Sequence, residues 1–532
     1  MRKKSMKWIA LLAASAMAAG TLAGCGNQST ADTAQTQTTA EASQGESAEE
    51  SAAGTENTAD TGEKPELKVM FYSQPYDMNA EPLKAVMEDL SGYQITYYNL
   101  PSENANEKLM LEVASGADYD MYYRMDSDAF SQLKDKNALI DLKPLLEEYG
   151  QDILANVNDI AWSAVTDEEG RILGIPLDTA DPSSKTYSGT ITGGIAFRSD
   201  TLEELGYEIP TTLDEFYEVC KAYTDKTGNP ALTVSKNGWL TDIMSAFGMG
   251  STSWYNVDGV QTPRVKMEGF KDYVAFMQKL YQEGILDNDM PINAAENCKE
   301  KFTSNTALCM QLAFWDIPSM VEAMAVSNPD AKAVFAVCLA KDENTPGFLS
   351  TNLGVSEISV ITKTSKNPED AVKWYNEISK PDNFKRIYIG EENVSYEVKD
   401  GQYYPIFPAF DEYVNSDKFT GSVNYAERNA EWEARARKTP EMAEAYEQMN
   451  EHLDEYDFYL SCEGFVSDPA LTEYMPSLNT AIGDLLIQGI AEGNDAQAVV
   501  DEIIQTWERE GGLECEAAMQ KWYDEHQELL NN

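Results

Sequence analysis

The sequence predicts an α/β fold for most of its 532 residues, and three observations support this. First, β-rich runs alternate with helical runs from position 66 onward, which favours right-handed βαβ units and a mostly parallel sheet. Second, composition changes abruptly near Glu66, and the chain beyond it is long enough for two or three compact units. Third, the pattern becomes mostly helical from about position 401 to the end.

The first 24 residues have the layout of a secretory signal. Four cations stand near the start, an apolar run extends from Trp8 to Ala19, and small residues follow. The apolar run is shorter than the roughly 20 residues needed to span a bilayer, and no later stretch has that length either. We therefore expect residues 1–24 to be an export signal.

Residues 22–25 read Leu-Ala-Gly-Cys, which resembles the lipobox of bacterial lipoproteins. In that motif the signal is cut before the cysteine and the cysteine is acylated, so the resemblance implies lipidation of Cys25. An ordinary signal that happens to contain a cysteine is the alternative. Two or more acyl chains give stable anchoring, which implies a protein tethered to the membrane and not spanning it.

Residues 25–65 are expected to form a disordered linker. They are rich in Ser, Thr, Ala, Gln, Glu and Gly and contain no aromatic residue, Leu, Ile or Val. Such a segment cannot bury enough apolar surface to offset its ordering entropy. A flexible chain of that length spans on the order of 35 Å.

Charge and cysteine content exclude some classes of function. The chain carries 40 Lys and Arg against 90 Asp and Glu, a net charge of −50, so nucleic acid and anionic lipid would be repelled. The six cysteines after Cys25 are widely spaced and form no CxxC motif. These cysteines could be small buried apolar residues or could form extracellular disulfides, and the sequence leaves both interpretations open.

The expected elements follow in order from Leu67. The first strand is "LKVMFYS" (67–73), a helix follows at 80–92 with a glycine stop, and the next strand is "YQITYYNL" (93–100). A Ser-capped helix and a glycine turn then lead to the strand "YDMYY" (119–123).

The middle of the chain continues this pattern. "RILGIPLD" (171–178) is strand-like, and a helix begins after Thr212 with Glu215 three residues later and stops at Gly228. Apolar residues at helical spacing within 269–289 predict an amphipathic helix.

Several segments, in this order, resemble one family, the extracellular solute-binding lipoproteins of ABC importers, in the carbohydrate-type family 1 and its LipO-like branch. The segments are "GADYDMYYR" (116–124), "NALIDLKPLLEEYG" (137–150), "GRILGIP" (170–176), 193–223, "TALCMQLAFWD" (306–316), "ITKTSKNPEDAVKWYNEI" (361–378) and "GEENVSYEVKDGQ" (390–402).

The resemblance implies a two-lobe fold of the periplasmic-binding-protein type, class II, with the ligand cleft between the lobes. Carried over, lobe 1 would hold 66–178 and about 354–400, and lobe 2 would hold 179–353. A helical C-terminal extension, about 401–532, would brace both. Hinges are expected near 175–178 and 353–360, since hinges are element ends that absorb backbone rotation.

Candidate ligand-binding residues come from two sources. In parallel sheets ligands lie beyond the carboxyl ends of strands, which selects Tyr72, Gln74, Tyr122, Arg124, Asp178, Trp315 and Asp316. An aromatic followed by an acid suits a sugar, because the ring covers the CH face and the carboxylate accepts from hydroxyls. Loop aromatics and the LipO-like segment add Trp239, Trp254, Glu392 and Tyr396, for each of which structural packing is the alternative.

The expected function is that of a lipid-anchored binding protein on the extracytoplasmic side of the cell membrane. It would be a monomer without cofactor, whose lobes close on a sugar or oligosaccharide and deliver it to an ABC permease. Hydrolase, phosphate-loop and HExxH motifs are absent, and the loop 224–238 lacks a dense set of carboxylates, so neither an enzyme nor a metal site is expected. A non-sugar solute such as a peptide, or a polysaccharide-degrading enzyme, is the alternative, and the sequence does not name the sugar.

Overall fold

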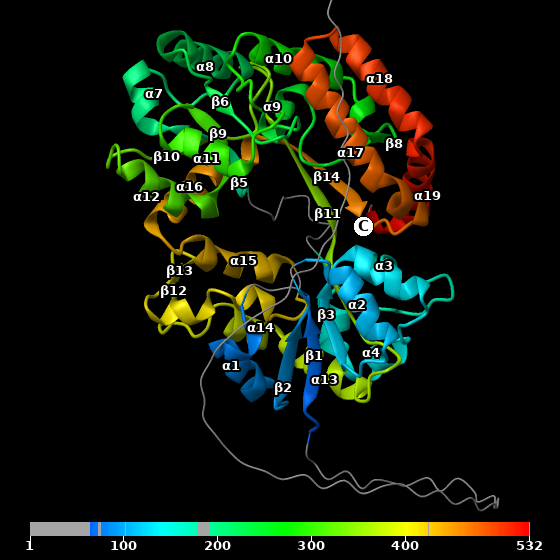
Figure 1. Ribbon diagram of the computed structural model, residues 1–532. Coiled ribbons are helices and arrows are strands. Elements are labelled where there is room, and N and C mark those ends of the chain that lie inside the picture. The colour runs from blue at the N-terminus through cyan, green and yellow to red at the C-terminus, as the bar shows by residue number, and fades with distance from the viewer. Residues whose placement is uncertain (1–63, 73–75, 102, 179–190, 424, 531–532) are drawn as a thin grey trace, which may run out of the picture. The chain divides into compact units, whose positions relative to one another are not determined.

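The computed structural model describes residues 64–72, 76–101, 103–178, 191–423 and 425–530 (Figure 1). Two separate sheets organise this part of the chain, with two additional hairpins. Within the described residues, no helix combines the length and the apolarity that crossing a bilayer requires.

The first sheet has six strands in the order β14-β11-β3-β1-β2, with β4 paired to β11. Strand β1 pairs in parallel with β2 and β3, as the sequence predicts for this part of the chain. Strand β11, in contrast, runs antiparallel to β3 and β4. The strands are β1 (Leu67–Phe71), β2 (Ile95–Asn99), β3 (Met121–Met125), β4 (Ile175–Asp178), β11 (Phe348–Val360) and β14 (Asp457–Gly464).

Helices on both faces bury this sheet. One core gathers around the fully buried Trp374, and a second contains Leu109 and Phe130 on the other face of β1 and β3. The elements are α1 (Pro82–Ser91), α2 (Ala105–Ala114), α3 (Ser127–Asp135), α4 (Lys143–Tyr149), α5 (Gln151–Asn156), α6 (Asp159–Ser163), α13 (Pro368–Ile378), α14 (Pro381–Tyr388), the short helices η1 (Met78–Ala80), η5 (Ala409–Tyr413) and η6 (Ser416–Lys418), and the hairpin β12 (Tyr396–Lys399) and β13 (Gln402–Pro405).

The second sheet has the order β10-β5-β9-β6. Strand β5 runs antiparallel to β10 and β9, while β6 runs parallel to β9. The strands are β5 (Gly193–Arg198), β6 (Leu232–Thr233), β9 (Cys309–Ala313) and β10 (Ala333–Ala336), and a separate hairpin is formed by β7 (Trp254–Val257) and β8 (Val260–Pro263).

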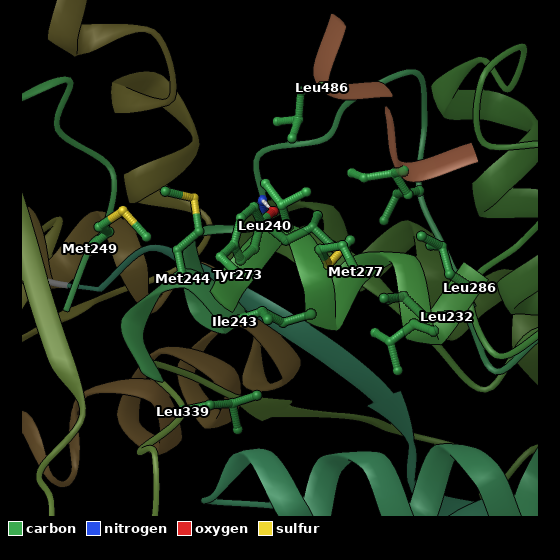
Figure 2. Packing of buried hydrophobic residues seen from close by; sticks show 14 of the residues in the cluster. Leu232, Leu240, Ile243, Met244, Met249, Tyr273, Met277, Leu286, Leu339 and Leu486 are labelled. Atoms are coloured by element: carbon green, nitrogen blue, oxygen red, sulfur yellow. Dashed lines mark hydrogen bonds between the residues drawn. The ribbon is translucent and has the colours of Figure 1, made fainter. Parts of the chain in front are cut away.

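The largest core lies against the second sheet and extends into the C-terminal helices (Figure 2). Met277 of α10 and Leu486 of α17 are both fully buried in it, and each such side chain contributes about 1.5–3 kcal/mol through burial. The predicted capping box at Thr212 and Glu215 is confirmed, as is the αL stop at Gly228. The helices are α7 (Ser199–Leu205), α8 (Leu213–Thr227), α9 (Thr241–Met244), α10 (Phe270–Gln282), α11 (Ala295–Thr303), α12 (Ile317–Ala325), η2 (Ser245–Phe247), η3 (Arg264–Lys266) and η4 (Phe314–Asp316).

The C-terminal segment packs on elements of both sheets. Helix α15 (Tyr425–Ala436) contacts β13 and α14, whereas α16 (Pro440–Asn450) contacts β10 and α12. The remaining helices, α17 (Pro469–Glu492), α18 (Ala496–Arg509) and α19 (Gly512–Leu530), pack on one another and on α10, and η7 (Leu453–Glu455) precedes β14. Strand β14 interrupts the expected helical segment, because 457–464 completes a ladder with β11. The lobe boundaries stay a prediction.

Strand β11 joins the two cores. Its residue Phe348 packs with Tyr459 against the core of the second sheet, while Leu353 lies in the core of the first. The register shifts between Asn352 and Gly354 in the pairing with β14, where β11 passes from one core to the other. This register shift lies at the start of the segment 353–360, where a hinge is expected.

Candidate functional site

A polar hollow lies at the carboxyl ends of β6 and β9. It encloses a cavity of about 400 Å³ that is lined by Gly193, Thr233, Val234, Ser235, Asn237, Ala295, Cys298, Lys299, Met310, Gln311, Leu312, Ala313 and Asp316. Hydroxyl and amide side chains from two separate segments, 233–237 and 310–316, meet here beside apolar side chains. That is the composition of a small-molecule site.

A second cavity of about 300 Å³ adjoins the first, because both are lined by Gly193 and Gln311. It adds further hydroxyl groups, from Ser251, Ser350 and Thr351. The exposed Gln311 on β9 therefore stands between two polar cavities, and its amide can both donate and accept hydrogen bonds.

Close strand packing shapes this hollow. A Cβ on Gly193 would meet the carbonyl oxygen of Leu312 at 2.9 Å, so β5 and β9 approach more closely than a side chain would allow. The opening between Gly193 and Gln311 depends on this approach.

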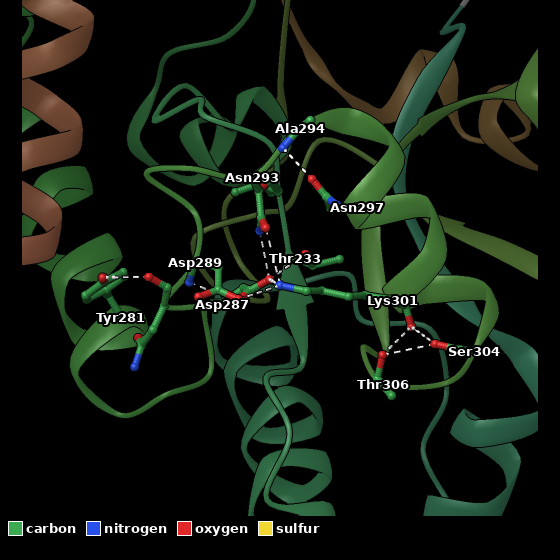
Figure 3. A network of polar contacts seen from close by, with 12 residues as sticks. Thr233, Tyr281, Asp287, Asp289, Asn293, Ala294, Asn297, Lys301, Ser304 and Thr306 are labelled. Carbon is green, nitrogen blue, oxygen red and sulfur yellow. Dashed lines mark hydrogen bonds and ion pairs between the residues drawn. The ribbon is translucent and has the colours of Figure 1, made fainter.

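A buried polar network fixes the end of β6 (Figure 3). The Thr233 hydroxyl donates to Asp287 Oδ2 at 2.8 Å, and Asn293 Nδ2 donates to the same oxygen at 2.8 Å. Lys301 Nζ lies 2.7 Å from it as well. Although burial acts to raise the pKa of the Asp287 carboxyl, Lys301 and the other donors hold it below its usual range, so the network stays ionised.

Trp315 and Asp316 follow the second sheet's strand β9, as expected. The ring of Trp315 is 54% exposed and packs edge-on against the buried Phe314 at 5.2 Å. Asp316 lines the larger cavity and lies 3.4 Å from Lys299. Trp315 itself lines neither cavity, but its neighbour in the chain, Asp316, lines the larger one together with Lys299.

Tyr72 and Arg124 lie at the carboxyl ends of β1 and β3. The Tyr72 hydroxyl donates to Asp126 Oδ2 at 2.7 Å, and burial, followed by this hydrogen bond, raises the pKa of Tyr72 to about 12. Arg124 has φ = 56°, which is rare for a residue with a side chain, and its guanidinium donates to Glu357. Burial acts to lower the pKa of Arg124, but the neighbouring Glu357 carboxylate acts to raise it. The net result is a raised pKa for Arg124.

Three predicted residues are buried instead of exposed. Tyr122 is fully buried on one face of β3, in the core that contains Leu109 and Phe130, and Tyr396 packs against Tyr403 within the hairpin β12–β13. Trp254 is buried against Trp507, with ring centroids 5.7 Å apart. Since these side chains offer no surface to a solute here, we assign them to packing.

Other predicted residues lie elsewhere. Trp239 stacks on Phe270 and carries Arg264 over its ring at 4.0 Å, in a cavity that shares no lining residue with the polar hollow. Glu392 is exposed in the turn before β12. The backbone of Asp178 pairs with Val355 at the end of β4. Gln74 and Cys25 lie outside the described residues.

Sequence reasoning missed most residues of the hollow. Gln311 could have been found, because it is the one polar residue of the apolar strand "CMQLA". Thr233 ends a strand of only two residues, Ser235 and Asn237 follow it, and none of them gave such a signal. Within the described part of the chain, no group of three or more His, Cys, Asp or Glu side chains is placed to hold a metal ion.

Two sheets with separate cores, joined by β11 and by the connection between α15 and α16, and a polar hollow at strand ends define a protein that binds a small solute. The match to the family described as "Bacterial extracellular solute-binding protein" covers residues 79–383, and the chain belongs to this family. It is therefore a binding component of a transporter and not an enzyme.

The chain is similar to lipoprotein LipO of Bacillus subtilis, with 23% identity over 493 residues, 89% of this chain and 95% of that protein. It is 25% identical over 272 residues to the fructooligosaccharide ABC transporter substrate-binding protein FusA of Streptococcus pneumoniae, which covers 45% of this chain and 50% of FusA. Among solved structures, the alginate-binding protein AlgQ2 without calcium ion superposes with a TM-score of 0.61 and 18% identity, covering 88% of this chain and all of that one.

Proposed function

We propose that the protein captures an oligosaccharide outside the cell for an ABC importer, and that it is held at the membrane by lipid on Cys25. The observation that carries the proposal is the polar hollow around Gln311, with the exposed Trp315 directly before the lining residue Asp316 in the chain. A ring that covers a sugar face, next to amides and hydroxyls that pair with sugar hydroxyls, is the chemistry of carbohydrate recognition.

The relatives support the class of ligand and the anchor. The name of FusA specifies a fructooligosaccharide, and the name of LipO specifies a lipoprotein. The lipobox-like residues 22–25 carry the anchoring proposal in this chain, which would face the extracytoplasmic side and deliver its solute to membrane permease subunits. Closure of two lobes on the solute requires that the solute prefers the closed state.

A thermal-shift screen over neutral and acidic mono- and oligosaccharides tests the proposal, since a ligand at 100 times its Kd stabilises the folded state by about 2.7 kcal/mol. At least one oligosaccharide is expected to raise the Tm without being degraded. Trp315→Ala should weaken its binding about 10-fold or more, because the stacking plane is lost.

Tyr207→Ala is the matched control. Tyr207 is also a partly exposed aromatic, at 39%, but it follows α7, and neither it nor its neighbours in the chain line either cavity of the hollow. Its loss should leave binding unchanged. Release of shortened glycans, or stabilisation by peptides with no response to any sugar, would contradict the proposal.

A further inference from the structure

Four cations surround one carboxylate at the carboxyl edge of the first sheet. Arg124, Lys418, Arg435 and Lys438, here termed the basic cluster, all act to lower the pKa of Asp417, which is below its usual range although burial opposes this. In a chain of net charge −50, such a local excess of positive charge needs a reason.

Most of the basic cluster is accounted for by internal pairing. Arg435 lies 3.0 Å from Asp417, and Arg124 pairs with Glu357. Lys418 lies 3.6 Å from Asp417 and 3.9 Å from Glu357. These contacts tie β3, β11, η6 and α15 together, which is a sufficient structural role for the three cations involved.

Lys438 is the exception. Among the described residues it has no carboxylate within ion-pair distance and no hydrogen bond, and Arg435 and Asp417 are its charged neighbours. Burial, and then the charge of Arg435, lower the pKa of Lys438 to about 8. Arg435 Nε is likewise buried without a partner among the described residues, so the cluster is short of acceptors.

The basic cluster is also in the right place to meet a solute. Arg124 is the next-to-last residue of β3, and the charges of Asp417, Glu81, Arg124 and Arg435 all act on the hydroxyl of Tyr76, which follows β1. Lys438 stands between α15, which packs on elements of the first sheet, and α16, which packs on the second. The side chains of Lys418 and Asp417 are 30% and 36% exposed, so solvent reaches the cluster.

We propose that Lys438 and the basic cluster bind a carboxylate group of the solute, and hence that the captured oligosaccharide is acidic. This inference rests on the proposed function and narrows its ligand class to uronic-acid-containing sugars. A carboxylate would supply the acceptors that the cluster lacks, and charge-assisted hydrogen bonds are the strong ones in such sites.

The test compares three probe sets by calorimetry on the full folded chain: oligogalacturonides and alginate oligosaccharides, their methyl-esterified forms, and neutral oligosaccharides such as kestose. At least one acidic set should bind, with an affinity that falls as salt rises, and esterification should weaken it about 10-fold or more. Lys438→Met should weaken the acidic probe about 10-fold and remove most of the difference between acid and ester, while its Tm stays equal to or above that of the native protein.

Lys271→Met is the control, because Lys271 is an exposed lysine on α10 that lines neither cavity and is not part of the basic cluster, and it should change nothing. Binding of neutral or esterified probes alone would overturn the acidic-ligand inference and leave the proposed function standing. Absence of binding by every acidic probe overturns it too, and binding only of acidic peptides would overturn both proposals.

Discussion

Lys301→Met should destabilise the end of β6 measurably. Among the described residues, Lys301 is the only cation that contacts Asp287 Oδ2, and the two side chains are 25% and 5% exposed. Removing one partner of a fully buried ion pair costs about 3–5 kcal/mol. Because Lys301 is partly exposed and Thr233 and Asn293 still donate, we expect about 2–3 kcal/mol.

The loss is measured by urea and thermal unfolding at pH 7 and at low pH. For a folded part of this size the entropy of unfolding is about 1 kcal/mol per K, so the Tm should fall by about 2–3 °C. The pKa of Asp287 is lowered in the folded protein, so its contribution is present above the ordinary carboxyl pKa and is lost as pH falls through the folded value. The difference between variant and native protein should therefore shrink toward pH 3.

Asp289→Asn provides the contrast, since Asp289 also contacts Lys301 but is 63% exposed, and it should cost at most about 0.5 kcal/mol. Equal stability of Lys301→Met and the native protein at pH 7, or a difference that does not change with pH, would refute the assignment of Lys301 as the counter-ion of Asp287.

Three further outcomes are expected. Burial raises the pKa of Asp242 to about 7, so its folded form keeps a proton that the unfolded form loses, and stability falls as pH rises from about 4 to 7; Asp242→Asn should flatten this part of the Tm profile. Gly354→Ala should cost about 1–3 kcal/mol in urea unfolding, because its Cβ would lie 2.3 Å from Gly464 Cα across the β11–β14 ladder, and unchanged stability would mean that the ladder is looser than described. Leu486→Ala should cost about 2–5 kcal/mol by the same measurement, since Leu486 is fully buried in the largest core, and a smaller loss would mean that the core collapses around the gap.

The alternation of strands and helices could be predicted from the sequence. Whether a given side chain is exposed or buried could be predicted only in part. Trp315 follows the last residue of β9 and is exposed, as strand-end reasoning expects. Tyr122 met the same criterion near the end of β3 but is buried, because a central strand is covered by helices on both faces and its alternation carries no exposed side.

The two polar sites were less predictable for a different reason. The pairing of Leu232 with Cys309 joins segments more than 70 residues apart, and the basic cluster joins Arg124 to Asp417 across almost 300 residues. No local pattern reports such long-range pairings, and in a chain with 90 acidic residues no carboxylate stands out by composition. These residues come together only through the order of the strands in the sheets.

The continuity of β11 has a consequence for how such a protein can be altered. Each sheet has its own core, while β11 of the first sheet contributes side chains to both cores, and its register against β14 shifts at Gly354. Substitutions around Gln311 or Lys438 can therefore be made in one half without repacking the interior of the other half. Residues 348–360, in contrast, constrain two interiors at once and should tolerate the least exchange in recombined or redesigned receptors.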